Sequence, residues 1–276
     1  MLAAVDNVQL GRPPSPAEAG CAIEVDRLAK AYRLGKETLV ALDDVSLVVR
    51  EGEFVSLVGP SGCGKSTLLN IVAGLVAKSS GRVTVRGREM TGPSRAIGMM
   101  FQSPVLLPWR TNIDNVLLPI EVFRLDLGDY REKARSLLRL VGLEGFADRY
   151  PLELSGGMQQ RVAICRMLLY DPAVLLMDEP FSALDEMSRE FMNLELLRIW
   201  DELRKTVVFV THNIGEAVFL SDRVVVMSAR PGRISRIVPV GLPRPRSKET
   251  LASDAFFHLV TAVRKTLDEP APRTDS

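Results

Sequence analysis

The segment "GPSGCGKST" at residues 59–67 constrains the fold most, because it matches the pattern G-x-x-x-x-G-K-[ST]. The unbroken apolar run "FVSLVG" at 54–59 precedes it, and the helix-like segment "KSTLLNIVAGL" follows it. In a strand–loop–helix unit of this kind, successive main-chain N–H groups can point at phosphate oxygens. The alternative is an ordinary glycine-rich turn, which the flanking strand and helix disfavour. The sequence therefore predicts a phosphate-binding loop.

The residue types in this loop suit particular contacts. Gly59 and Gly64 let the backbone curl around phosphates, Lys65 can reach the β- and γ-phosphates, and the Ser66 hydroxyl can bind Mg²⁺. We expect the rest of the loop to contact the nucleotide as well, through Ser61, Gly62, Cys63 and Thr67. The alternative for Cys63 is a tolerated small residue without a catalytic role, and we favour that interpretation.

Short β-branched runs alternate with longer helical patterns along the chain. Residues 22–32, 45–59 and 82–87 are typical of strands joined by turns. Apolar runs typical of buried parallel strands lie at 54–59, 97–102, 173–180 and 207–213. Helical spacing of apolar residues occurs at 132–141, 157–170 and 186–205. This alternation predicts a mainly parallel sheet covered on both faces, with ligands bound at the carboxyl ends of its strands.

Two further apolar runs end in residues that suit phosphate chemistry. In "LLMDEP", Asp178 is placed to hold Mg²⁺ and Glu179 to deprotonate an attacking water. In "VVFVTHN", His212 follows a strand and can reach a γ-phosphate. A solvated turn and a structural histidine are the alternatives, but the order of these motifs after a phosphate loop favours catalysis.

A second glycine turn, "LSGGMQQR" at 154–161, opens another amphipathic helix. Ser155, Gly156 and Gly157 can present a hydroxyl and free N–H groups at a helix start, where the helix dipole favours an anion. The chain thus carries two candidate phosphate-binding segments.

Composition narrows the class of protein. The 276 residues are 46% hydrophobic and 25% charged, and the formal net charge of +1 gives no electrostatic reason to expect nucleic acid as a partner. Three cysteines and two histidines argue against structural disulfides and zinc sites. No apolar run reaches the roughly 18–20 residues of a membrane helix, and the first residues lack the basic start of a secretory signal.

Taken in order, Tyr32, "GPSGCGKST", Gln102, "LSGGMQQR", "LLMDEP", "SALD" and "THN" closely resemble the nucleotide-binding subunit of ABC transporters. The resemblance spans about residues 22–235. It implies an α/β P-loop NTPase (RecA-like) core with an N-terminal antiparallel β subdomain and an inserted α-helical subdomain at about 103–165. We expect this domain at 21–245, a flexible extension at 1–20, and a C-terminal helix and tail at 246–276.

The resemblance implies a homodimer in which the signature segment 154–161 of one copy covers the ATP held by the phosphate loop of the other. Tyr32 would stack on adenine, and Gln102 would reach Mg²⁺ and the attacking water. Asp185 would link the two sites across the dimer. Trp109 and Arg110 lie where this family meets its membrane subunits.

The phrases "LLPWRTNIDNV", "NLELLRIW" and "EAVFLSDRVVVMSARPGRI" resemble the branch of ABC importers that takes up nitrate, sulfonates or taurine. This implies membrane permease subunits and a periplasmic or lipid-anchored solute-binding protein as partners. The chain would lie peripherally on the cytoplasmic face of the inner membrane. An exporter ATPase is disfavoured because no membrane helices are fused to the chain. A soluble ABC ATPase of DNA repair or translation is disfavoured by the near-neutral charge and the lack of a sustained heptad.

Overall fold

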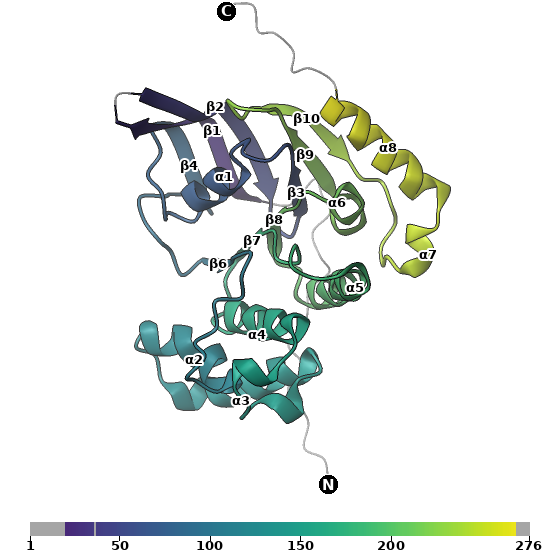
Figure 1. Ribbon diagram of the computed structural model, residues 1–276. Coiled ribbons are helices and arrows are strands. Elements are labelled where there is room, and N and C mark those ends of the chain that lie inside the picture. The colour runs from purple at the N-terminus through teal and green to yellow at the C-terminus, as the bar shows by residue number, and fades with distance from the viewer. Residues whose placement is uncertain (1–19, 36, 269–276) are drawn as a thin grey trace, which may run out of the picture.

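The computed structural model describes residues 20–35 and 37–268. Apart from Gly20, the expected N-terminal extension lies outside the described residues, as does the end of the chain at 269–276. The described chain forms two sheets with helices packed around them (Figure 1).

One sheet is antiparallel and has the strand order β2-β1-β4-β5. Its strands are β1 (Cys21–Leu34), β2 (Glu37–Arg50), β4 (Ser80–Val85) and β5 (Arg88–Glu89). The long pairing of β1 with β2 contains register shifts, for example between Val25 and Leu28. This sheet corresponds to the β-rich N-terminal part that the sequence predicts.

The other sheet has the strand order β10-β9-β3-β8-β7-β6. Its strands are β3 (Phe54–Val58), β6 (Ile97–Met100), β7 (Val174–Asp178), β8 (Thr206–Val210), β9 (Arg223–Met227) and β10 (Ile234–Pro239). Five of them run parallel, and β10 pairs antiparallel with β9 at one edge. The mainly parallel sheet predicted from the four apolar runs is confirmed.

Side chains that alternate between the two faces explain why the parallel strands are apolar at most positions. In β3, Phe54 and Val58 face one hydrophobic cluster, whereas Val55 and Leu57 face another. The second cluster lies against α1 (Lys65–Val72) and the antiparallel sheet, and the first lies against the other helices. A sheet buried on both faces favours apolar side chains at most positions, because neither face meets water, and the buried Ser56 of β3 is hydrogen-bonded to Ser221.

The remaining helices surround the parallel sheet (Figure 1). They are α2 (Asn112–Val122), α3 (Leu127–Leu140), α4 (Gly156–Leu168), α5 (Glu186–Leu203), α6 (Ile214–Leu220), α7 (Lys248–Leu251) and α8 (Asp254–Asp268), with 3-10 turns at Glu144–Phe146 and Pro151–Glu153. Helices α2, α3 and α4 pack together at one end of the molecule, away from the antiparallel sheet. Helix α8 contributes Phe256 and Val263 to the core.

Local capping explains where the helices begin. Helix α3 starts at Leu127, five residues before the predicted start, because the Asp126 carboxylate accepts a hydrogen bond from Gly128 N at 2.8 Å. Helix α2 begins after Thr111, whose hydroxyl accepts from Asp114 N, and it tolerates Pro119 in its interior. The apolar periodicity does not predict α2, since its proline argues against a helix at that point.

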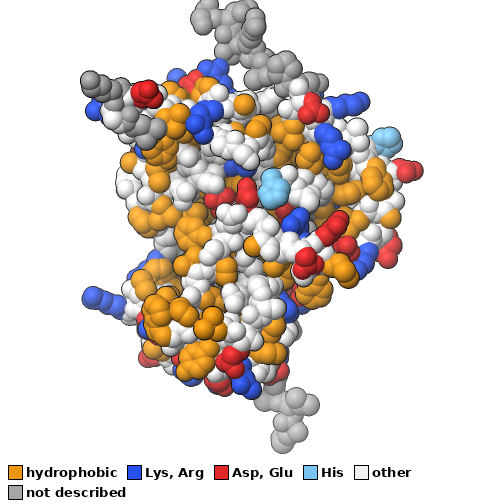
Figure 2. Space-filling model, in the orientation of Figure 1, with side chains coloured by type: hydrophobic (Ala, Val, Ile, Leu, Met, Phe, Trp, Pro, Cys, Tyr) orange, Lys and Arg blue, Asp and Glu red, His pale blue; other side chains and the backbone are white. Residues whose placement is uncertain are grey.

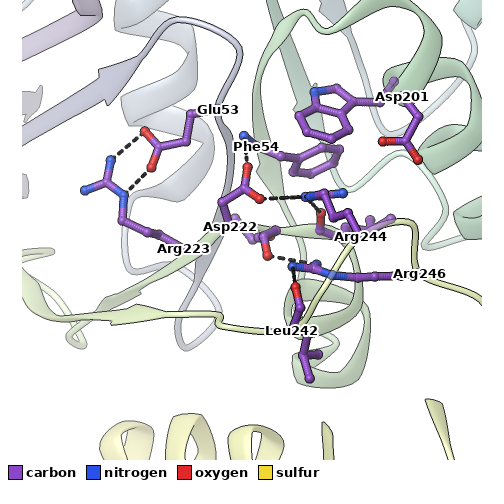
Figure 3. Close-up of polar contacts among 12 residues, drawn as sticks. Glu53, Phe54, Asp201, Asp222, Arg223, Leu242, Arg244 and Arg246 are labelled. Carbon is purple, nitrogen blue, oxygen red and sulfur yellow. Dashed lines mark hydrogen bonds and ion pairs between the residues drawn. The ribbon is translucent and has the colours of Figure 1, made fainter. Parts of the chain in front are cut away.

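A polar cluster joins the chain that follows β10 to the sheet (Figure 3). The carboxylate of Asp222 accepts hydrogen bonds from Phe54 N at 2.9 Å and from Arg244 Nε at 3.0 Å. The Arg244 guanidinium also lies 4.1 Å from the ring centroid of Trp200. Arg246 donates to the carbonyl oxygens of Phe219 and Ser221, and its burial lowers its pKa to about 10.

We predict that Asp222→Ala lowers the free energy of unfolding by about 2 kcal/mol, because it leaves the Phe54 N–H without its acceptor and removes the carboxylate partner of the mostly buried Arg244 guanidinium. Urea denaturation measures this change. Asp26→Ala is the control, since Asp26 forms an exposed ion pair with Arg27 and its loss leaves stability almost unchanged. Equal losses in the two variants would contradict this role for Asp222.

Candidate nucleotide-binding site

The phosphate loop at 59–67 joins β3 to α1 and curls around the side chain of Lys65. The Lys65 ammonium donates to Gly59 O at 2.8 Å and to Pro60 O at 3.1 Å, so it lies within the curl of the loop. Gly64 has φ +101°, and a Cβ there would lie 2.6 Å from Leu42 Cδ2. Only glycine fits this backbone conformation and this close approach.

The end of β7 lies next to the start of α1. Ser66 Oγ donates a hydrogen bond to Asp178 Oδ1 at 3.0 Å, which joins the two motifs across 112 residues of sequence. Burial raises the pKa of the Asp178 carboxyl, and the nearby Glu179 carboxylate adds to the rise, whereas the hydrogen bond from Ser66 opposes it. The structure therefore holds a partly buried carboxylate and a hydroxyl side by side, as the sequence predicts.

Glu179 turns away from the end of β7. Its φ of +45° is uncommon for a residue other than glycine, and its N–H still donates to Val210 O at 2.9 Å. Its Oε2 lies 3.2 Å from His212 Nδ1, a contact in which the imidazole donates when Nδ1 carries the proton. The carboxylate predicted to deprotonate the attacking water and the histidine predicted to reach the γ-phosphate are thus brought together.

A cavity of about 300 Å³, here called the loop cavity, adjoins the phosphate loop. It is lined by Tyr32, Leu39, Ala41, Ser61, Gly62, Gly64, Lys65, Ser66, Thr67, Glu179 and Arg230. Tyr32 on β1 therefore shares a cavity with the loop, although 27 residues separate Tyr32 from Gly59 in sequence. The Cys63 side chain instead is fully buried in the hydrophobic core, so only the main chain of Cys63 remains to meet a ligand.

Gln102 lies beside the segment that follows Glu179, and it is not among the residues lining the loop cavity. Its Nε2 donates to Ser182 Oγ at 3.1 Å, and Ser182 Oγ donates to Glu179 O at 3.0 Å. Ser182 is the first residue of "SALD", and it connects Gln102 to the acidic motif. No local pattern in the sequence gives this serine a role, because a single serine in a turn is not distinctive.

The second glycine turn lines a different cavity, of about 480 Å³, here called the signature cavity. Ser155, Gly156, Gly157 and Asp185 line it together with the first turns of α4 and α5. Ser155 caps α4 by accepting from Met158 N at 3.4 Å. Asp185 caps α5 in the same way, and its hydrogen bonds with Ser188 lower its pKa. Within the described chain, no residue lines both cavities.

Arg230, in the connection between β9 and β10, is a cavity residue that the sequence motifs miss. Its Nε and Nη2 donate to Gly62 O at 3.2 and 3.1 Å. The segment "SARPGR" predicts a proline–glycine turn and nothing more, and Arg230 lies 168 residues after Gly62 in the sequence. Neither composition nor periodicity indicates that this turn reaches the phosphate loop.

Trp109 and Arg110 lie just before α2. The Trp109 side chain is 71% exposed, and Arg110 forms an ion pair with Glu121 at 2.7 Å. Figure 2 shows hydrophobic side chains gathered over the end of the molecule that α2 and α3 form. Trp200 and Met100, by contrast, are buried in the core. Within residues 20–35 and 37–268, no helix has both the length and the apolar character needed to cross a membrane.

Comparison with known proteins identifies the family. The family model described as ABC transporter matches residues 42–182. An ABC transporter ATP-binding protein of Methanocaldococcus jannaschii is 49% identical over 229 residues, which cover 83% of this chain and 86% of that protein. The aliphatic sulfonates import ATP-binding protein SsuB of Bacillus cereus is 43% identical over 228 residues, which cover 82% of this chain and 89% of SsuB.

Solved structures agree with this result. The dimeric structure of the ATP-binding cassette MJ0796, bound to ADP and Pi in a post-hydrolysis state, superposes with a TM-score of 0.70 at 35% identity. The match covers 80% of this chain and all of that one. The predicted P-loop ABC ATPase fold is thereby confirmed. The chain belongs to the ABC transporter family, and it is an ATP-binding subunit whose ATPase activity is coupled to transport.

Proposed function

We propose that this chain hydrolyses ATP in a head-to-tail homodimer and thereby powers the uptake of a small anion of the nitrate, sulfonate or taurine type. One observation supports ATP hydrolysis most strongly. The Ser66–Asp178 hydrogen bond and the Glu179–His212 contact lie together beside the phosphate loop, at the carboxyl ends of the parallel strands.

The loop cavity holds the nucleotide in this proposal. The triphosphate lies along the loop main chain, with Ser61, Gly62 and Thr67 on its sides, and Lys65 leaves the carbonyl oxygens of Gly59 and Pro60 to meet the β- and γ-phosphates. Tyr32 lies on β1 at the wall of the same cavity, where its ring can stack on adenine. Cys63 contributes its main chain alone.

The residues present fit a Mg²⁺ ion. Ser66 Oγ and Asp178 Oδ1 are oxygen atoms 3.0 Å apart, and oxygen atoms of hydroxyl and carboxylate groups are the ligands that Mg²⁺ prefers. Ser66 and Asp178 would hold the ion, with Gln102 reaching it after its amide leaves Ser182. Bound Mg²⁺ would neutralise charge on the phosphate oxygens.

Water activation falls to Glu179 with His212. The Glu179 carboxylate accepts a proton from the attacking water, and its 3.2 Å contact with His212 holds the carboxylate in place. When its ring carries both protons, His212 can also donate a hydrogen bond from Nε2 to the γ-phosphate. Once its amide has left Ser182, Gln102 orients the same water. Of these side chains, Glu179 and His212 are already in contact.

The signature cavity supplies the other half of each site, in the second copy of the chain. Ser155 and the first N–H groups of α4 face outward and can bind a γ-phosphate. A Cβ at Gly157 would meet nothing within 4 Å, and one at Gly156 would meet only Leu184 Cδ2 at 3.8 Å. The surface beside these two glycines is therefore open, which leaves room for the close approach of a second copy. Asp185 lies at the same surface and links the two sites.

The importer assignment rests on relatives and on the exposed surface. Relatives named as aliphatic sulfonates import ATP-binding proteins share 42–43% identity with this chain. We infer that Trp109, with Arg110 and the hydrophobic surface around it, contacts membrane permease subunits at the cytoplasmic face of the inner membrane (Figure 2). The cargo reaches the permease through a periplasmic or lipid-anchored solute-binding protein.

We predict that Glu179→Gln keeps the affinity for ATP but lowers the ATPase rate about 100-fold or more, because the general base is lost. ATP should then trap a dimer that size-exclusion chromatography detects. Glu202→Gln, which makes the same change on the exposed face of α5, serves as the control. An ATPase rate of Glu179→Gln near that of the wild type would remove Glu179 from this role.

We predict that Ser155→Arg binds ATP with the wild-type Kd but forms no ATP-dependent dimer and hydrolyses no ATP. The arginine fills the signature cavity and leaves the loop cavity untouched. Titration with ATP, chromatography and a phosphate-release assay check the three parts. Ser94→Arg adds the same side chain at an exposed serine outside both cavities. Normal hydrolysis by monomers of Ser155→Arg would contradict the shared site.

We predict that a host lacking this chain fails to grow with one of three sources: nitrate as nitrogen source, or taurine or an alkanesulfonate as sulfur source. Growth should return with the wild-type chain but not with Glu179→Gln, because uptake needs hydrolysis. Normal growth of the deletion strain on all three, in a host with no second importer for them, would contradict the proposed cargo class.

A further inference from the structure

The turn between β9 and β10, residues Ser228–Arg233, packs directly against the phosphate loop. A Cβ at Gly232 would lie 1.9 Å from Cys63 O, so the turn and the loop touch main chain to main chain. Gly232 N also donates to Ala41 O at 3.0 Å, and Gly232 O accepts from Asp43 N at 3.0 Å. The turn is thus fixed between β2 and the loop.

The turn is also held together internally. Ser228 N donates to Arg233 O at 2.9 Å, and Arg233 N donates to Ser228 Oγ at 3.1 Å. The Arg233 guanidinium forms an ion pair with Asp43 on β2. Because these contacts fix the main chain on both sides of Arg230, little main-chain entropy remains to be lost when Arg230 binds a ligand.

Arg230 extends from this turn to the wall of the loop cavity. Among the described residues that line the cavity, Lys65 and Arg230 carry positive charge. The guanidinium donates through Nε and Nη2 to Gly62 O, and a guanidinium has more N–H donors than these two. The remaining donors can bind an anion without giving up the bond to the loop.

We propose that Arg230 is a phosphate-binding residue of the nucleotide site, which it reaches from the β9–β10 turn. This rests on the proposed placement of ATP in the loop cavity. Arg230 binds phosphate oxygens of the nucleotide with the N–H groups that do not contact Gly62. Its hydrogen bonds to Gly62 O hold the guanidinium next to the phosphate loop. Planar, forked N–H donors suit phosphate better than a single ammonium does.

The test compares Arg230→Gln, which removes the charge, with Arg230→Lys, which keeps it. We place both in the Glu179→Gln background, so that ATP is not consumed, and measure the Kd for ATP by titration calorimetry. Arg230→Gln should raise the Kd about tenfold, the change expected for one lost charge-assisted hydrogen bond. Arg230→Lys should raise it less. The Kd of the parent should rise more steeply with salt than that of Arg230→Gln, because one ionic contact is missing in the variant.

Two control variants separate the possible causes. Arg236→Gln removes the same charge from an exposed site on β10 that does not line the loop cavity, and it should leave the Kd unchanged. Lys65→Ala tests the nucleotide site itself. If Lys65→Ala binds ATP normally, the proposed placement of ATP fails, whatever Arg230 does.

If Lys65→Ala no longer binds ATP, the Kd values of the Arg230 variants decide the proposal. An unchanged Kd in Arg230→Gln would overturn it. Arg230→Gln and Arg230→Lys could instead raise the Kd for ATP equally, with the same salt dependence of Kd as in the parent. That result would also overturn the proposal, because it would mean that Arg230 only supports the Gly62 carbonyl. The unfolding midpoint of the nucleotide-free protein should be the same in both variants.

Discussion

In the six-stranded sheet β8 lies between β3 and β7, and all three strands run in the same direction. Their carboxyl ends therefore meet at one edge, which brings the phosphate loop, Asp178 and His212 together from three distant parts of the sequence. The hydrogen bond from Ser66 to Asp178 depends directly on this strand order. The parallel sheet is stable only if both of its faces are covered. The antiparallel sheet with α1 covers one face and the other helices cover the opposite face, so both layers hold the strands whose ends carry the site.

Close main-chain contacts around the phosphate loop add a second constraint. Gly64 approaches β2, and Gly232 approaches Cys63 O, at distances that leave no room for a side chain. The loop is therefore held between the antiparallel sheet and the β9–β10 turn. The signature cavity is separate and faces outward, which is why the proposed catalytic site needs a second copy of the chain.

The sequence predicts the parallel sheet and the position of each motif at a strand or helix end, because buried strands and glycine loops have strong local patterns. It places α3 five residues late, since the cap at Asp126 lies outside the apolar period. Arg230 and Ser182 escape prediction because their importance comes from tertiary contacts with Gly62 and Gln102, which no local pattern encodes. The burial of the Cys63 side chain is likewise a consequence of packing.

The proposal that two copies share each site can be tested by mixing two inactive variants. Lys65→Ala removes the phosphate-loop half of the site, and Ser155→Arg removes the signature half. In a mixed dimer, one site combines the intact loop of one chain with the intact signature segment of the other. Shared sites predict that ATPase activity returns when the purified variants are mixed in equal amounts. If each chain instead hydrolyses ATP with its own two segments, the mixture stays as inactive as its components, and the account is wrong.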